Sequence, residues 1–326
     1  MTRTALATLL LASSTIAAPA IAQEPTPSAN AAKSERLPRV IKERLSIPEG
    51  EWTGPRLADG QPDVSGFWSN MIANHNNFTD PQAGAPGEPT EAANLPRDQR
   101  APSRVSDPED GQVPYLPEAR VLQQDFAENF ANPTKSRYIE PMARCAPAGV
   151  PKSLYWHGYE IRQYPGYVVF LFDTGTRIIR LGDAKHIHPD IKLWNGDSIG
   201  HWEGNTLVVD VTNNNGKALF GRTGDFMSEN ATVAERYVFA QDGASFNYVA
   251  TFTDPTVYSR PWTATVPTRR YTAEDEPDGW HYDVTPVNNP GQPRDYEMPE
   301  RICVENNGPF GGGAIGVVVH EPLIQR

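Results

Sequence analysis

The chain of 326 residues carries 29 lysines and arginines against 40 aspartates and glutamates, which gives a formal net charge of −11. Such an acidic surface disfavours binding to nucleic acid or to anionic lipid, and no cluster of basic residues opposes that conclusion. Outside residues 1–22, no apolar run approaches the ~18 residues that a membrane-spanning helix needs, so we expect no membrane insertion.

Residues 1–22 have the pattern of a secretory signal peptide. Arg3 supplies a positive charge, residues 5–12 form a short apolar stretch, and Ala20-Ile21-Ala22 provides the small residues of a cleavage site. The mature protein is therefore expected to be periplasmic or secreted.

After this leader, the sequence predicts a tail followed by one domain. Residues 23–60 are rich in Pro, Ala, Glu and Ser, which is typical of a segment that lies across a domain or moves freely. Residues 61–326 are expected to form a single β domain. Its clearest helical pattern covers residues 116–130, where apolar residues recur near i, i+4 spacing: Val121, Leu122, Phe126 and Phe130.

Most of the domain consists of short β-branched or aromatic runs separated by turn residues. The predicted strands are residues 159–163, 167–173, 177–181, 206–212, 234–239, 245–254, 262–271 and 280–284. The Gly-x-Trp sequence at Gly66-Phe67-Trp68 is typical of the first strand of lipocalin-type barrels. We therefore expect a mainly β fold with long irregular N-terminal segments. It would be an antiparallel barrel of the calycin or lipocalin type, or a sandwich, with about eight strands.

Cys145 and Cys303 are the only cysteines of the chain. An isolated pair in an oxidising compartment most often forms a disulfide, which would stabilise the fold by roughly 4–5 kcal/mol in the chain-entropy model. A catalytic thiol is the alternative, although neither cysteine has a histidine as a sequence neighbour.

Residues 194–212 hold the densest set of titratable and aromatic side chains. His201 and Glu203 are two residues apart, so on an extended backbone they share a face, and Asp197 could reach them from a turn. A carboxylate beside a histidine fixes the tautomer and stabilises the imidazolium. The set predicts an acid–base site with His201 as acid or base, Glu203 or Asp197 as its partner and His188 nearby. An ion-paired strand entrance without catalysis is the alternative.

His186 and His188 have the one metal-like spacing in the chain. With His201 or Asp183 they could make a three-ligand zinc site. Pro189 follows the pair, however, and favours a loop with two partly exposed histidines. We therefore predict no bound metal and no other cofactor.

Aromatic residues near the central stretch are candidates for substrate binding. Trp194, Trp202 and Tyr159 would line a pocket, and Arg260 would clamp a carboxylate or close one end of the barrel. The motifs of serine hydrolases, phosphate-binding loops, Rossmann folds and zinc proteases are missing from the sequence.

The chain resembles a broad, uncharacterised family of exported bacterial β proteins. The most specific motif is Gly196-Asp197-Ser198-Ile199-Gly200-His201-Trp202-Glu203-Gly204. Further motifs are Pro62-Asp63-Val64-Ser65-Gly66-Phe67-Trp68, Cys145-x-Pro147-x-Gly149-x-Pro151, Thr206-Leu207-Val208-Val209-Asp210, Glu235-Arg236-Tyr237, Asp254-Pro255, Arg260-Pro261-Trp262 and Cys303-x-Glu305-Asn306. The chain departs from the family pattern at Asn205, where Asp is usual, and at residues 182–189, where Asp-Gly-Arg-x-His-Pro is usual. The resemblance implies a secreted β protein and supplies no reaction.

These features predict an exported enzyme that acts on a small apolar or aromatic molecule by acid–base chemistry, as a lyase, isomerase or hydratase. A periplasmic small-molecule-binding protein with a calycin-like cavity, without catalysis, is the alternative, and a structural envelope protein is the third. The expected partner is a small molecule. The sequence does not decide the oligomeric state, and a homodimer is compatible with it.

Overall fold

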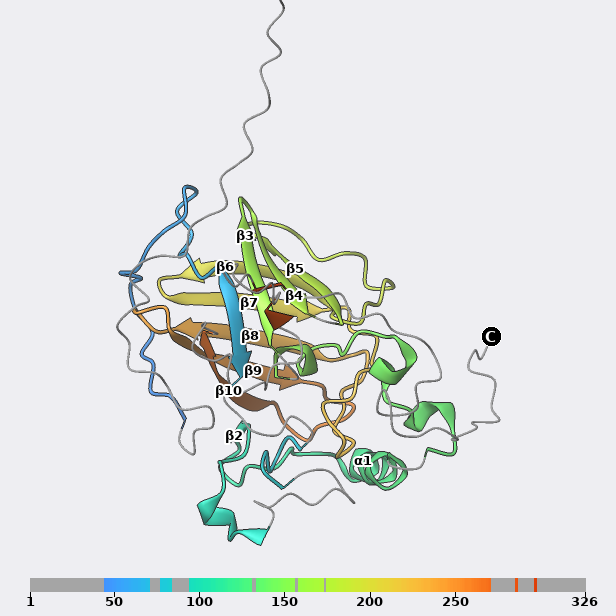
Figure 1. Cartoon of the computed structure of the whole chain (residues 1–326). Helices are drawn as coiled ribbons and strands as arrows, with labels where there is room; N and C mark the ends of the chain where they lie inside the picture. The colour runs from blue at the N-terminus through green and yellow to red at the C-terminus, as the bar shows by residue number, and fades with distance from the viewer. Residues whose placement is uncertain are drawn as a thin grey trace, which may run out of the picture.

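The computed structural model describes residues 44–70, 77–83, 94–130, 133–155, 158–172, 174–270, 285–286 and 296–297 (Figure 1). The predicted signal peptide, residues 23–43 of the tail, the predicted strand at residues 280–284 and Cys303 lie outside this part of the chain.

The described residues form one large sheet, one small β pair and one α-helix. The strands of the large sheet are β1 (Gly66–Asn70), β2 (Val105–Asp107), β3 (Tyr159–Tyr164), β4 (Tyr167–Phe172), β5 (Gly175–Leu181), β6 (Asp197–Glu203), β7 (Thr206–Thr212), β8 (Thr232–Phe239), β9 (Ser245–Thr253) and β10 (Trp262–Arg270). The small pair is β11 (Thr285–Pro286) with β12 (Tyr296–Glu297), and the helix is α1 (Pro117–Asn129). Among the described residues there is no helix with the length and apolar character needed to cross a bilayer.

The large sheet closes into a barrel. Strand order runs from β1 through β3 to β10, and β1 pairs again with the end of β10, at residues 268–270. The remaining strand, β2, pairs with the beginning of β10, so β1 and β2 share one edge of that strand. The prediction of a mainly β fold is confirmed, and of its two forms the barrel is the correct one. The barrel is not fully antiparallel, because β5 and β6 are parallel.

The parallel pair explains the long connection between β5 and β6. Two parallel neighbours cannot be joined by a hairpin, because the chain must first return along the length of the sheet. Residues 182–196 make this return, and we call them the crossover loop. They carry His186, His188 and Trp194, so three of the side chains considered as site residues are placed on a loop by the topology of the barrel.

Hydrophobic alternation places large aromatic side chains inside the barrel. Trp68 on β1 is fully buried and makes edge-on contacts with Phe239 and Phe246, at ring-centroid distances of 5.6 and 4.9 Å. Edge-to-face geometry of this kind is favoured by the ring quadrupoles and adds to the gain from burial. The Gly-x-Trp sequence thus supplies a buried aromatic on the first strand.

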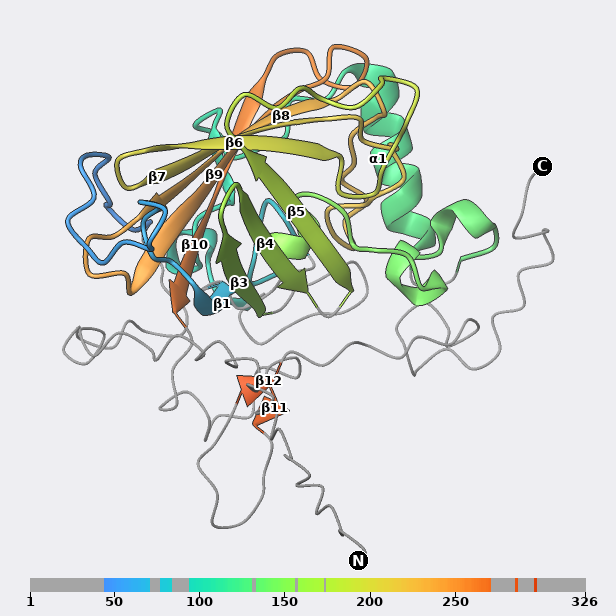
Figure 2. The ribbon, with the colours of Figure 1, turned by 90° about the horizontal axis from the view of Figure 1, so that it is seen from above.

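The two ends of the barrel are covered by different segments (Figure 2). Residues 44–56, which we call the strap, lie against the β6–β7 and β8–β9 turns, and α1 lies at the opposite end. One anchor of the strap is Asn205: its amide nitrogen donates to the carbonyl oxygens of Pro48 and Phe239, at 3.0 and 2.6 Å. Its side-chain oxygen accepts from the Gly50 N–H at 2.9 Å.

Candidate functional site

His201 and Glu203 lie on the outer wall of the barrel. The His201 Nε2 to Glu203 Oε1 distance is 3.1 Å, and the side chains are 59% and 50% exposed. The other carboxylate oxygen of Glu203 accepts a hydrogen bond from Arg236 at 2.9 Å. Hydrogen bonds from His201 and Arg236 lower the pKa of Glu203. The predicted pair therefore exists, but it is a solvent-exposed surface pair.

Asp197 belongs to a second cluster. Four residues separate it from His201 on the same face of β6, which corresponds to about 13 Å along the strand. Asp197 accepts hydrogen bonds from Arg180, at 2.8 and 2.9 Å, and its Oδ2 lies 2.8 Å from Nδ1 of His186. Nε2 of His186 lies 2.9 Å from the Asp210 carboxylate. Both ring nitrogens of His186 thus contact carboxylates of the barrel wall, so this cluster fastens the crossover loop to β6 and β7.

His188 does not join either cluster. Its side chain is 69% exposed and lies beside Asp190, at 3.5 Å. The expectation that His188, Asp197, His201 and Glu203 share one site is therefore wrong in its geometry, because the extended backbone of β6 keeps the two carboxylates apart. Among the described residues, no group of three His, Cys, Asp or Glu side chains has the geometry of a metal site.

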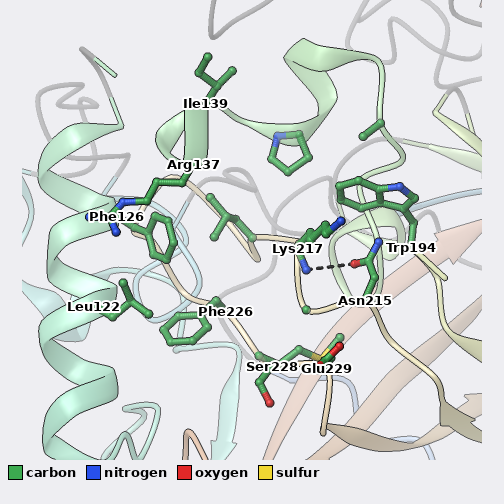
Figure 3. A pocket seen from close by; sticks show the side chains of 15 residues that line it. Leu122, Phe126, Arg137, Ile139, Trp194, Asn215, Lys217, Phe226, Ser228 and Glu229 are labelled. Atoms are coloured by element: carbon green, nitrogen blue, oxygen red, sulfur yellow. Dashed lines mark hydrogen bonds between the residues drawn. The ribbon is translucent and has the colours of Figure 1, made fainter. Parts of the chain in front are cut away.

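A cleft of about 580 Å³ lies between α1 and the loop that joins β7 to β8 (Figure 3). We call it the α1 cleft. Figure 3 shows Leu122 and Phe126 of α1 facing Trp194 and Asn215 across it. Its main apolar lining residues are Leu122, Phe126, Ile139, Trp194, Leu219, Phe226 and Met227. Its charged or hydrogen-bonding lining residues are Arg137, Asn215, Lys217, Ser228 and Glu229.

The cleft forms because α1 presents only part of an apolar stripe to the barrel. Ala119 and Gln123 are buried, and the Gln123 side chain donates to the Thr223 carbonyl oxygen in the β7–β8 loop. Leu122 and Phe126, at i and i+4, face the cleft. Gly224 makes this approach possible, since a Cβ atom there would lie 2.4 Å from the Gln123 carbonyl oxygen. The apolar spacing that predicted the helix thus also supplies one wall of the cleft.

Beneath this wall lies a buried acid, Asp225. Its carboxylate accepts hydrogen bonds from the hydroxyls of Tyr115 and Thr223, at 3.1 and 2.7 Å. Desolvation by burial raises the pKa of Asp225 above its ordinary value of 3.8, more than those hydrogen bonds lower it.

We predict a pH-dependent effect of Asp225→Asn. A raised pKa in the folded state means that the native protein takes up a proton before the unfolded chain does. The wild type therefore gains stability relative to the Asn variant as the pH falls through that pKa. At pH 7 the variant, whose amide can serve both hydroxyls, should melt at the same or a higher temperature than the wild type. This advantage should shrink as the pH is lowered toward 4. A difference in Tm that grows on acidification would contradict the prediction.

The barrel interior contains a polar network that the sequence did not reveal as a site. Arg177 on β5 and Glu235 on β8 form two hydrogen bonds, at 3.1 and 2.6 Å, and both side chains are at most 2% exposed. Ser198 accepts from the same guanidinium, and Tyr248 donates to Glu235 at 2.8 Å. Tyr237 contacts both charged groups. Burial raises the pKa of both tyrosines, so they stay neutral donors.

The signal for this network was present in the motifs. Ser198 belongs to the central motif, and Glu235 and Tyr237 to the Glu-Arg-Tyr motif. Period-2 alternation sends Glu235 inward and Arg236 outward, so a charged residue in a predicted strand was the clue. Its partner Arg177 was assigned to the third predicted strand without a role.

Of the four predicted substrate-binding residues, Trp194 alone lines the α1 cleft. Tyr159 is fully buried inside the barrel. Trp202 packs against Phe239. Arg260 pairs with Asp107 at 2.6 Å, which links the β9–β10 loop to the end of β2.

Cys145 follows the short 3₁₀ helix Pro141–Arg144. Its backbone is left-handed, and the next residue, Ala146, lines the α1 cleft. Because Cys303 lies outside the described residues, the disulfide stays a prediction.

Comparison of the chain with known proteins finds no matching family model, no matching characterised protein and no matching solved structure. The resemblance drawn from the motifs remains an expectation.

Proposed function

We propose that this chain is an exported protein that binds a small, largely apolar or aromatic molecule in the α1 cleft. The observation that carries the proposal is the cleft itself: about 580 Å³, with a mainly apolar lining and a few polar groups. Sites for small molecules typically have this volume and this composition. Export is supported by the leader sequence, and a Cys145–Cys303 bridge would suit an oxidising compartment.

The lining favours binding over chemistry. The residues that the sequence suggested for proton transfer, His201, Glu203 and Asp197, are not among the residues that line the cleft. Burying a small ring against the apolar lining of the cleft would contribute about 25 cal/mol per Å². The polar groups on the β7–β8 loop would orient the ligand.

Acid–base catalysis by His201 and Glu203 is a second candidate, favoured by their 3.1 Å contact. Two observations weigh against it. Both side chains are half exposed, so no apolar wall holds a substrate there, and the lowered pKa of Glu203 makes it a weaker base.

A fluorescent probe tests the cleft. N-phenyl-1-naphthylamine is neutral and brightens in apolar surroundings, so the mature protein should raise its emission in a saturable titration. Ala146→Phe, which places a ring in the cleft, should raise the Kd of the probe at least tenfold, or about 1.4 kcal/mol.

His201→Ala is the matched control for this experiment. Because the His201 side chain is 59% exposed, its removal should change neither the Kd of the probe nor the Tm by much. If His201→Ala raises the Kd of the probe while Ala146→Phe leaves this Kd unchanged, the binding site is on the outer wall and the proposal for the α1 cleft is wrong.

A further inference from the structure

The charge of the α1 cleft differs from that of the whole protein. Its lining contains two cations, Arg137 and Lys217, against one anion, Glu229, whereas the chain has a net charge of −11. Arg137 is already paired with Asp125, at 2.8 Å. Within the described part of the chain, no acidic side chain lies within ion-pairing distance of the Lys217 ammonium.

The backbone that carries Lys217 is firmly placed. The Lys217 N–H donates to the Asn215 side chain at 3.0 Å, as Figure 3 shows, and Leu193 N–H donates to the Asn213 carbonyl at 2.8 Å. Gly216 has φ +64, and a Cβ atom there would lie 2.6 Å from the Glu229 nitrogen, so only glycine fits this turn. Lys217 therefore starts from a fixed point on the side of the cleft opposite α1.

We propose that the ligand of the α1 cleft is an organic acid, with an apolar body against α1 and a carboxylate or sulfonate at Lys217. This inference rests on the proposed function. An ammonium group in the lining of a mainly apolar cleft attracts an anion, whereas the net negative charge of the protein as a whole repels one. Glu229 lies on the same loop, but its charge is negative, like the net charge of the protein, so it does not attract an anion.

Two probes with the same aromatic rings test the charge preference. 1-Anilinonaphthalene-8-sulfonate differs from N-phenyl-1-naphthylamine by its sulfonate group. The mature protein should bind the sulfonate two- to fivefold more tightly, about the strength of an exposed ion pair. Lys217→Met should abolish that preference, by weakening the binding of the sulfonate more than that of the neutral probe. Lys217→Arg should retain the preference.

Glu229→Gln is the matched control, because it removes the opposite charge from the same loop. It should keep or increase the preference for the sulfonate. Raising the salt concentration should weaken the binding of the sulfonate probe and leave the binding of the neutral probe unchanged. If both probes bind equally well to the wild type, or if Lys217→Met weakens both alike, the cleft binds apolar rings without selecting an acid and this inference is wrong. If neither probe binds, the proposed function fails as well.

Discussion

Replacing Glu235 by Gln should lower the free energy of unfolding by roughly 3–5 kcal/mol, because it leaves the buried Arg177 without its counter-charge. Burial alone would lower the pKa of Arg177, and Glu235 together with Tyr237 and Tyr248 more than reverses that effect, so the guanidinium is charged in the folded protein. Gln keeps the size of the side chain and one acceptor, but it cannot balance a full positive charge. Equilibrium unfolding in urea measures the difference.

The matched control is the exposed pair of the outer wall. Glu203→Gln removes the same kind of group from a contact with Arg236, where the Glu203 side chain is 50% exposed, and should cost less than about 1 kcal/mol. Changing Arg177 to Met together with Glu235 to Leu should recover much of the loss, since a buried pair can often be replaced by apolar side chains. A loss below 1 kcal/mol for Glu235→Gln would show that the network contributes little to stability.

Asn205→Asp should have the second largest effect. The Asn205 side chain is fully buried and donates to the carbonyl oxygens of Pro48 and Phe239. An ionised Asp carboxylate cannot donate a hydrogen bond to either carbonyl oxygen. The substitution would therefore bury a negative charge and leave both carbonyl oxygens without these two hydrogen bonds. From the usual cost of such groups we expect a loss of about 3 kcal/mol or more.

The strap should report this change directly. Amide hydrogen exchange of the strap, for example at Gly50 N–H, should accelerate in Asn205→Asp more than exchange in β9. Thr53→Val is a suitable control. Thr53 lies on the same strap, and its hydroxyl makes an exposed contact with Gln241 of the β8–β9 turn. The idea is wrong if Asn205→Asp leaves both the stability and the exchange of the strap unchanged. The family pattern with Asp at this position would then also suit this chain.

The sequence predicted the barrel strands well where hydrophobic alternation and turn residues agree. The predicted runs at residues 159–163, 167–173, 206–212 and 245–254 all correspond to strands. β6 was harder to predict, because Asp197, Gly200 and Glu203 are typical of turns. They adopt a strand because neighbours on both edges supply hydrogen bonds, which no local pattern records.

The site was less predictable than the fold, and the reason is distance along the chain. The α1 cleft joins residues 122–146, residue 194 and residues 215–229, so its walls meet only after the barrel closes. His201 and Glu203 were found by spacing alone, which indicates a shared face but not which side of the barrel that face covers. The Val121 side chain, grouped with the apolar positions of the helix, is 66% exposed.

The count of strands in the barrel has a consequence for where the cleft can form. In a closed ring, strands that all run opposite to their neighbours must be even in number. This ring contains nine, β1 and β3 to β10, so parity requires an odd number of parallel neighbours, and there is one, between β5 and β6. The long return of the chain over residues 182–196 is therefore required by the odd number of strands in the ring. A barrel with one strand more or less could replace this return by a tight hairpin, and it would then lose Trp194 from the wall of the cleft.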